Sequence, residues 1–186
     1  MNAFKKILGL VLIFNCFVAR TQSAAKQNGE WTVVSAIVKF KIKNAGINVS
    51  GSFSGLTAKI IFDATKNTGN SISATVDAKT IDTDNKTRDG HLKKEEYFDV
   101  EKYPKISLVS TLFGKAEDNG FRGYFTLTIK DKSKTVTIPF TFIEKNGTAV
   151  FKGSFTLNRL DFGVGESSII LSDNVTVEVE VNVIRK

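Results

Sequence analysis

The chain has 186 residues, of which 41% are hydrophobic and 24% charged, and its formal net charge is +7. This length favours one domain. Lysines alternate with acidic and hydroxyl residues and form no dense basic block, so the charge indicates solubility and excludes a nucleic-acid partner.

The N-terminus has the layout of a secretory signal peptide. Lys5 and Lys6 precede an apolar run at 7–18, and the small residues Ser23, Ala24 and Ala25 follow. The run is too short to span a bilayer. We expect residues 1–25 to be removed and 26–186 to form the exported domain, in the periplasm or secreted. A buried N-terminal helix is the alternative.

Cys16 is the single cysteine and lies inside this apolar run. A lipoprotein anchored through Cys16 is a further alternative, which the bulky Phe14 and Asn15 before it disfavour. Cleavage near Ala25 leaves a mature chain without cysteine, and therefore without disulfides or thiol chemistry. Loss of Lys5, Lys6 and Arg20 also lowers the formal charge of the mature chain.

From Trp31 onward, apolar and polar residues alternate with a period of two, which is typical of strands with one buried face. The inward faces are expected at 38–42, 72–78, 121–129, 136–142, 151–157 and 175–183. Turns rich in Gly, Asn and Asp separate these runs, as in "KNTGN", "AEDNG" and "EKNG". About eight such strands with hairpin-sized gaps predict an all-β, antiparallel sandwich or barrel.

A transmembrane barrel would also alternate, but its outer face must be apolar. Here the polar faces carry Lys39, Lys41, Glu178 and Glu180. We therefore expect a soluble barrel with an apolar interior and no integral membrane insertion.

Residue types for catalysis are scarce. His91 is the only histidine, so zinc sites with several His or with Cys and His cannot form in the mature chain. No Gly-x-Ser-x-Gly sequence supports a catalytic triad, and "GVGESS" lacks the Lys of a phosphate loop. The protein is predicted not to be an enzyme and to have no catalytic residue, metal or cofactor.

Three ordered motifs carry a resemblance to a known family. They are Arg88-Asp89, His91-Leu92, Tyr97-Phe98-Asp99 and Tyr103-Pro104 in one segment, then Leu127 to Phe142, and then Phe155 to Gly165. Together they resemble the YceI-like family of secreted proteins that bind polyisoprenoids and other long-chain lipids. The resemblance implies an eight-stranded, antiparallel, lipocalin-like barrel with a helical insertion and a long apolar cavity. One departure is Val34-Ser35-Ala36-Ile37, where the family often carries Asp-x-x-His-Ser.

Under this resemblance the segment from Arg88 to Pro104 is a short helical insertion at one end of the barrel. Asp99 is placed to cap the following turn with its carboxylate, and Pro104 starts the next strand. Arg88 and Asp89 pair locally or hold a loop; alternatively, Arg88 and His91 lie near a lipid head group. Arg159 and Asp161 are interpreted as a structural pair.

The predicted function is to hold a long-chain isoprenoid or acyl lipid tail inside the barrel. Burial of each methylene contributes ~0.8 kcal/mol, so a charged contact is not required. The alternative is a ligand-free barrel acting as a surface or stress-related interaction module, and a homodimer is left open. The expected tail-binding residues are Phe40, Phe53, Ile72, Ala74, Val76, Leu92, Phe98, Leu108, Phe125, Leu127, Phe140, Phe155 and Phe162.

Overall fold

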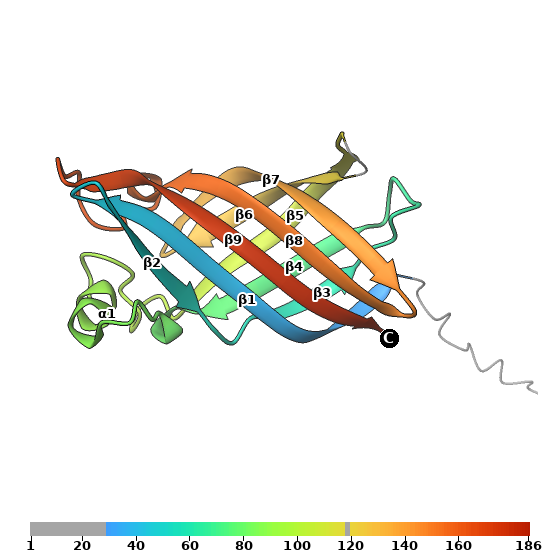
Figure 1. Ribbon diagram of the computed structural model, residues 1–186, viewed down its shortest axis with the longest axis horizontal. Helices are drawn as coiled ribbons and strands as arrows, with labels where there is room; N and C mark the ends of the chain where they lie inside the picture. Colours follow the sequence, from blue (N-terminus) through green and yellow to red (C-terminus); the bar gives the residue numbers. More distant parts are fainter. Residues whose placement is uncertain (1–28, 118–119) are drawn as a thin grey trace, which may run out of the picture.

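The structure is a computed structural model that describes residues 29–117 and 120–186 (Figure 1). The expected signal peptide lies outside the described residues. Neighbouring strands are antiparallel, and β1 pairs with β9 to close the sheet into a barrel. The strands are β1 (Glu30–Asn44), β2 (Ile47–Phe53), β3 (Thr57–Ile61), β4 (Ser71–Asp77), β5 (Lys105–Lys115), β6 (Phe121–Ile129), β7 (Lys132–Lys145), β8 (Thr148–Asn158) and β9 (Leu171–Arg185).

Nine strands occupy eight positions because β2 and β3 together form one interrupted strand. On β1, Val38 lies opposite Phe53 of β2, and Trp31 lies opposite Ile60 of β3. The two pairs are seven positions apart on both sides, so the register is continuous across the break. The predicted eight-stranded antiparallel barrel is confirmed.

The alternation places most apolar side chains of the strands inside the barrel, as predicted. The outer face carries ion pairs between neighbouring strands, such as Lys41 with Glu178 at 2.9 Å and Lys152 with Glu180 at 3.0 Å. A bulge after Val33 shifts the register of β1 against β9 by one residue and leaves Val34 exposed. The bulge keeps the inward face of β1 apolar on both sides of it.

A helical insertion connects β4 to β5 and contains η1 (Ala78–Thr80) and α1 (Lys86–Leu92). Asn85 caps α1, because its Oδ1 accepts a hydrogen bond from the Arg88 amide at 3.0 Å. Two backbone hydrogen bonds between Ser52 and Asp82, of 2.8 and 3.0 Å, join the insertion to β2. The insertion therefore covers one end of the barrel, below β2 in Figure 1.

The end of this insertion differs in detail from the sequence expectation. The turn after Asp99 is held by its backbone carbonyl, which accepts from the amides of Lys102 at 3.1 Å and Tyr103 at 2.8 Å. Asp99 has a φ of 48°, which is left-handed backbone and not an N-cap conformation, so the expected carboxylate cap is wrong. Pro104 directly precedes β5, and its carbonyl accepts from the Ala78 amide at 2.8 Å.

The opposite end of the barrel is packed with aromatic rings. Phe62 is 1% exposed, and five other phenylalanine rings lie with their centroids 5.0–5.6 Å from its own. Trp31 donates from Nε1 to the Phe62 carbonyl at 2.8 Å. We call this cluster the packed end; its buried members are Trp31, Ile60, Phe62, Phe140, Ala149, Phe151, Val181 and Val183.

Candidate ligand cavity

The half of the barrel nearer α1 is hollow, with a cavity of about 650 Å³. The cavity is lined mainly by aliphatic and aromatic side chains from the strands and the insertion. Inward side chains such as Phe40, Ile42 and Val177 are only partly buried because they face this space. The size is typical of small-molecule pockets, which span ~300–1,000 Å³.

The packed end forms the floor of the cavity. Ile60, Phe140, Phe151 and Val181 belong to the packed cluster and also line the cavity. Their rings and branched side chains therefore stop the space at mid-barrel. The space extends from there toward the end that carries the insertion, which we call the open end of the cavity.

Twelve of the thirteen expected tail-binding residues line the cavity, although their contact with a lipid stays a prediction. They are Phe40, Phe53, Ile72, Ala74, Val76, Leu92, Phe98, Leu108, Phe125, Leu127, Phe140 and Phe155. Phe162 does not line it. It lies in the 3-10 helix η2 (Arg159–Phe162) and is 1% exposed, buried with Leu127, Ile129 and Val164. The period of two that places side chains inside the barrel holds for strands and does not apply to a 3-10 helix.

A glycine lets an aromatic ring pack closely against one wall of the cavity. A Cβ on Gly51 would lie 2.3 Å from the Phe40 ring and 2.8 Å from Cγ2 of Thr83, so the Phe40 ring lies directly against the β2 backbone. The Phe40 and Phe53 ring centroids are 5.6 Å apart, and Phe53 meets Phe98 edge to face at 5.6 Å. This row of rings forms an apolar wall between β1 and the insertion.

Polar side chains gather on the insertion side of the cavity. Arg88 donates from Nε to the Thr83 hydroxyl at 2.8 Å and from Nη2 to the Thr83 carbonyl at 2.6 Å. His91, in the last turn of α1, is exposed and also borders the cavity. The Nε and Nη2 groups of Arg88 thus hold the loop through Thr83. That Arg88 lies near a lipid head group remains a prediction.

Asp89 contacts the same threonine from the other side. It is 4% exposed, and its Oδ1 accepts from the Thr83 amide at 2.9 Å and the Thr83 hydroxyl at 2.7 Å. The hydrogen bond from the Thr83 hydroxyl is the main reason why the pKa of Asp89 lies below its ordinary value. Of the two local roles expected for Arg88 and Asp89, holding the loop is the one observed.

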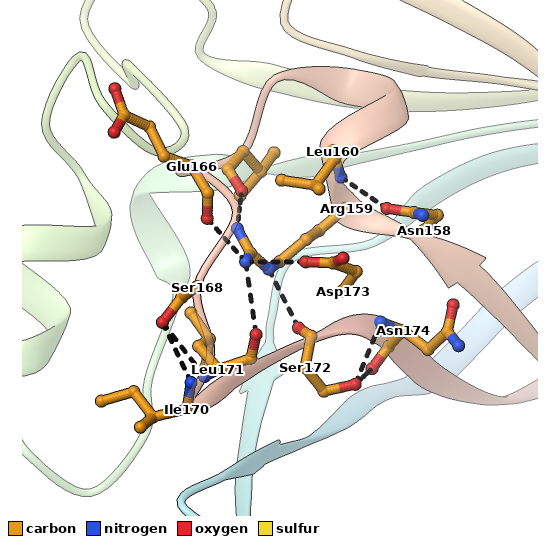
Figure 2. Close-up of polar contacts among 11 residues, drawn as sticks. Asn158, Arg159, Leu160, Glu166, Ser168, Ile170, Leu171, Ser172, Asp173 and Asn174 are labelled. Atoms are coloured by element: carbon orange, nitrogen blue, oxygen red, sulfur yellow. Dashed lines mark hydrogen bonds and ion pairs between the residues drawn. The ribbon is translucent and has the colours of Figure 1, made fainter.

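Arg159 holds the loop that leads into β9 (Figure 2). It is 4% exposed and donates to the carbonyls of Val164 at 2.8 Å, Glu166 at 2.7 Å and Ser172 at 3.0 Å. Its acidic partner is Asp173, at 3.1 Å. The expected pair with Asp161 is wrong, because Asp161 lies on the exposed side of η2, 4.0 Å from Lys134.

Sequence reasoning missed two features of this site. Thr83, which is 4% exposed and ties together Arg88 and Asp89, was not identified. Asn44 and Asn85 at the cavity border were also missed, although Asn85 three residues before Arg88 is a recognisable cap signal.

Within residues 29–117 and 120–186, no three His, Cys, Asp or Glu side chains are grouped so as to hold a metal ion. No helix in this part of the chain has the length and hydropathy needed to cross a membrane. What the site offers chemically is an apolar space that removes a hydrocarbon group from water.

The fold and the cavity together define a lipocalin-like barrel with room for a small apolar ligand. The family profile described as "YceI-like domain" matches residues 30–183, and the chain belongs to this family.

Relatives and solved structures agree with this assignment. A UPF0312 protein of Pseudomonas syringae pv. tomato is 30% identical over 156 residues, covering 77% of this chain and 80% of the relative. BcnA of Burkholderia cenocepacia superposes with a TM-score of 0.76 at 27% identity, over 79% of this chain and 95% of BcnA. A polyisoprenoid binding domain from Saccharophagus degradans superposes at 0.66 with 12% identity, over 84% and 98%, which shows a shared fold.

Proposed function

We propose that the protein is an exported, non-enzymatic binding protein that holds the tail of a polyisoprenoid or another long-chain lipid in its cavity. The observation that carries this proposal is the apolar space of about 650 Å³ that ends on the packed rings. The Saccharophagus degradans domain, which has the same fold, is described as polyisoprenoid binding.

The energetics favour a hydrocarbon ligand. Each five-carbon isoprene unit moved from water into the cavity contributes roughly 4 kcal/mol before ordering costs. With Arg88 engaged by Thr83 and Arg159 by carbonyls and Asp173, the lining offers few free cations for a head group. Affinity is therefore expected to come from the tail, with little discrimination between tails of similar length.

The cavity also supports this proposal over the ligand-free alternative. A barrel that acts only through its outer surface gains stability from a filled interior, because voids forfeit packing contacts. This chain fills one half of its barrel with rings and leaves the other half open. An unfilled half is useful to a protein that takes up a ligand.

The test is to identify lipid that purifies with the protein. The full chain is expressed in a bacterial host, purified without detergent, extracted with organic solvent and analysed by mass spectrometry. We expect a long-chain isoprenoid or acyl lipid at near-stoichiometric amount, and much less from the Ala74→Trp variant, whose indole occupies the cavity. Equal traces of lipid from both proteins would favour the ligand-free alternative.

A further inference from the structure

Three fully or largely exposed isoleucines stand beside the open end of the cavity. Ile47 begins β2 and is 70% exposed, while Ile169 and Ile170 precede β9, with Ile169 completely exposed and Ile170 58% exposed. Other exposed large hydrophobic side chains of the described residues lie within strands, such as Val34 and Ile143. We call Ile47, Ile169 and Ile170 the isoleucine tip.

Two turns that are distant in sequence carry this tip. The Ala45 amide donates to the Ile170 carbonyl at 2.7 Å, and Asn44 lies opposite Leu171 in the β1–β9 ladder. The β1–β2 turn and the start of β9 accordingly lie side by side at the left of Figure 1. Neither turn carries a charged side chain over 44–49 or 167–171.

The tip continues the apolar lining of the cavity outward. Ile47 is on the same face of β2 as Val49, which lines the cavity. Leu171, which follows Ile170, also lines it, as does Asn44 between the two turns. A hydrocarbon chain leaving the cavity at this point meets the tip next.

The exposed loop is held in place. Arg159 binds the carbonyls of Val164, Glu166 and Ser172, and the Ser168 hydroxyl accepts from the amides of Ile170 and Leu171 at 3.3 Å each (Figure 2). A buried arginine is thus used to order a segment that ends in two exposed isoleucines. The hydrogen bonds thus hold the two isoleucines in a fixed, exposed position.

We propose that the isoleucine tip docks the open end of the barrel on the surface of a lipid bilayer, so that the tail passes between membrane and cavity without crossing water. This inference rests on the proposed function, since a long-chain lipid has its reservoir in a membrane. A second protein is a poorer occupant, because stable protein interfaces use ~20–30 residues on each side and the tip offers three.

The expected strength is that of a reversible anchor. The three side chains together carry about twelve carbons, close to a single myristoyl chain, which binds membranes with an association constant on the order of 10⁴ M⁻¹. Reversible docking lets the protein leave with its cargo.

The experiment measures binding of the purified full-length protein, after delipidation, to vesicles of phosphatidylcholine alone and of phosphatidylcholine mixed with phosphatidylglycerol. The test variant is Ile47→Ser/Ile169→Ser/Ile170→Ser. The matched control is Val34→Ser/Leu112→Ser/Ile143→Ser, whose three side chains are 60–64% exposed on the outer faces of strands. Thermal melts check that both variants fold.

We expect the wild type and the control to bind both kinds of vesicle, and the tip variant to bind at least roughly tenfold more weakly, since each buried methylene changes partitioning by about fourfold. Equal binding by all three proteins overturns the proposal. So does binding that is confined to the anionic vesicles and that the tip variant retains.

A second titration separates this inference from the function on which it rests. Geranylgeraniol added from ethanol should enter the wild type and the tip variant equally, because the cavity is unchanged. Uptake of geranylgeraniol without vesicle binding by the wild type refutes the docking surface and leaves the cavity function standing. Tip-dependent vesicle binding without uptake refutes the cavity function and supports docking.

Discussion

Ala74 tests, at the scale of one residue, whether the interior is open or filled. It lies on the cavity wall, whereas Ala149 is 3% exposed within the packed end. We expect Ala74→Trp to change the free energy of unfolding by less than ~1 kcal/mol, because the indole enters empty space, and to reduce lipid uptake strongly. Ala149→Trp, the matched control, should cost ~1–3 kcal/mol or more by overpacking. Denaturant unfolding of both variants and a lipid titration of Ala74→Trp decide the point, and equal destabilisation would contradict an open cavity.

Asp89 gives the insertion a defined pH dependence. Its pKa is lower in the folded protein, chiefly because of the Thr83 hydroxyl bond, so its contribution to stability is complete above the unfolded value of about 3.9 and is lost as the pH falls through the folded value. Asp89→Asn should therefore have a lower Tm than the wild type at neutral pH. The difference between the two should shrink below about pH 4. A difference that stays constant down to pH 2 would show that the Thr83 bonds do not depend on the charge.

At the scale of elements, Arg159 is expected to order the loop at 163–172. Arg159→Met removes hydrogen bonds to three carbonyls and the ion pair with Asp173, so we expect a loss of about 3 kcal/mol in unfolding free energy. Amide hydrogen exchange in this loop should accelerate at the same time. Arg122→Met, on the exposed face of β6, serves as control and should stay within about 0.5 kcal/mol of the wild type. Unchanged exchange in the Arg159 variant would refute the anchoring role.

The strands and their inward faces were predictable from the sequence, because a period of two is a local property. Phe40 and Val177 could be placed inside the barrel from their neighbours alone. The division into a hollow half and a packed half could not, since it depends on where rings from distant strands meet. Phe62 directly follows β3 and was not among the expected inward faces, yet it is the centre of the packed end.

The remaining errors concern turns. Asp161 is two residues from Arg159, but the 3-10 geometry of η2 leaves it exposed and brings Asp173 to the guanidinium instead. The same helix buries Phe162 with Leu127, Ile129 and Val164, so that it does not itself line the cavity. The ion-pair partner of Arg159 and the packing partners of Phe162 depend on local backbone geometry, which composition and spacing do not specify.

At the scale of the whole molecule, export predicts a defined mature chain. The motivating features are Lys5 and Lys6 followed by the apolar run at 7–18. We expect the intact mass of protein recovered from the periplasm or medium to correspond to a start between Ala24 and Gln27. A mature N-terminus at Cys16 carrying acyl chains would instead make the protein a membrane-anchored lipoprotein.

The central claim is that the hollow half of the barrel holds a hydrocarbon tail, and a chain-length series tests it most directly. Delipidated protein is titrated with isoprenols that differ by successive five-carbon units, and the dissociation constant of each is measured by calorimetry. We predict that affinity rises with each unit, by at most ~4 kcal/mol, until the cavity of about 650 Å³ is full, and then stays constant. Affinity that does not depend on chain length, or no uptake of any member, would contradict the account.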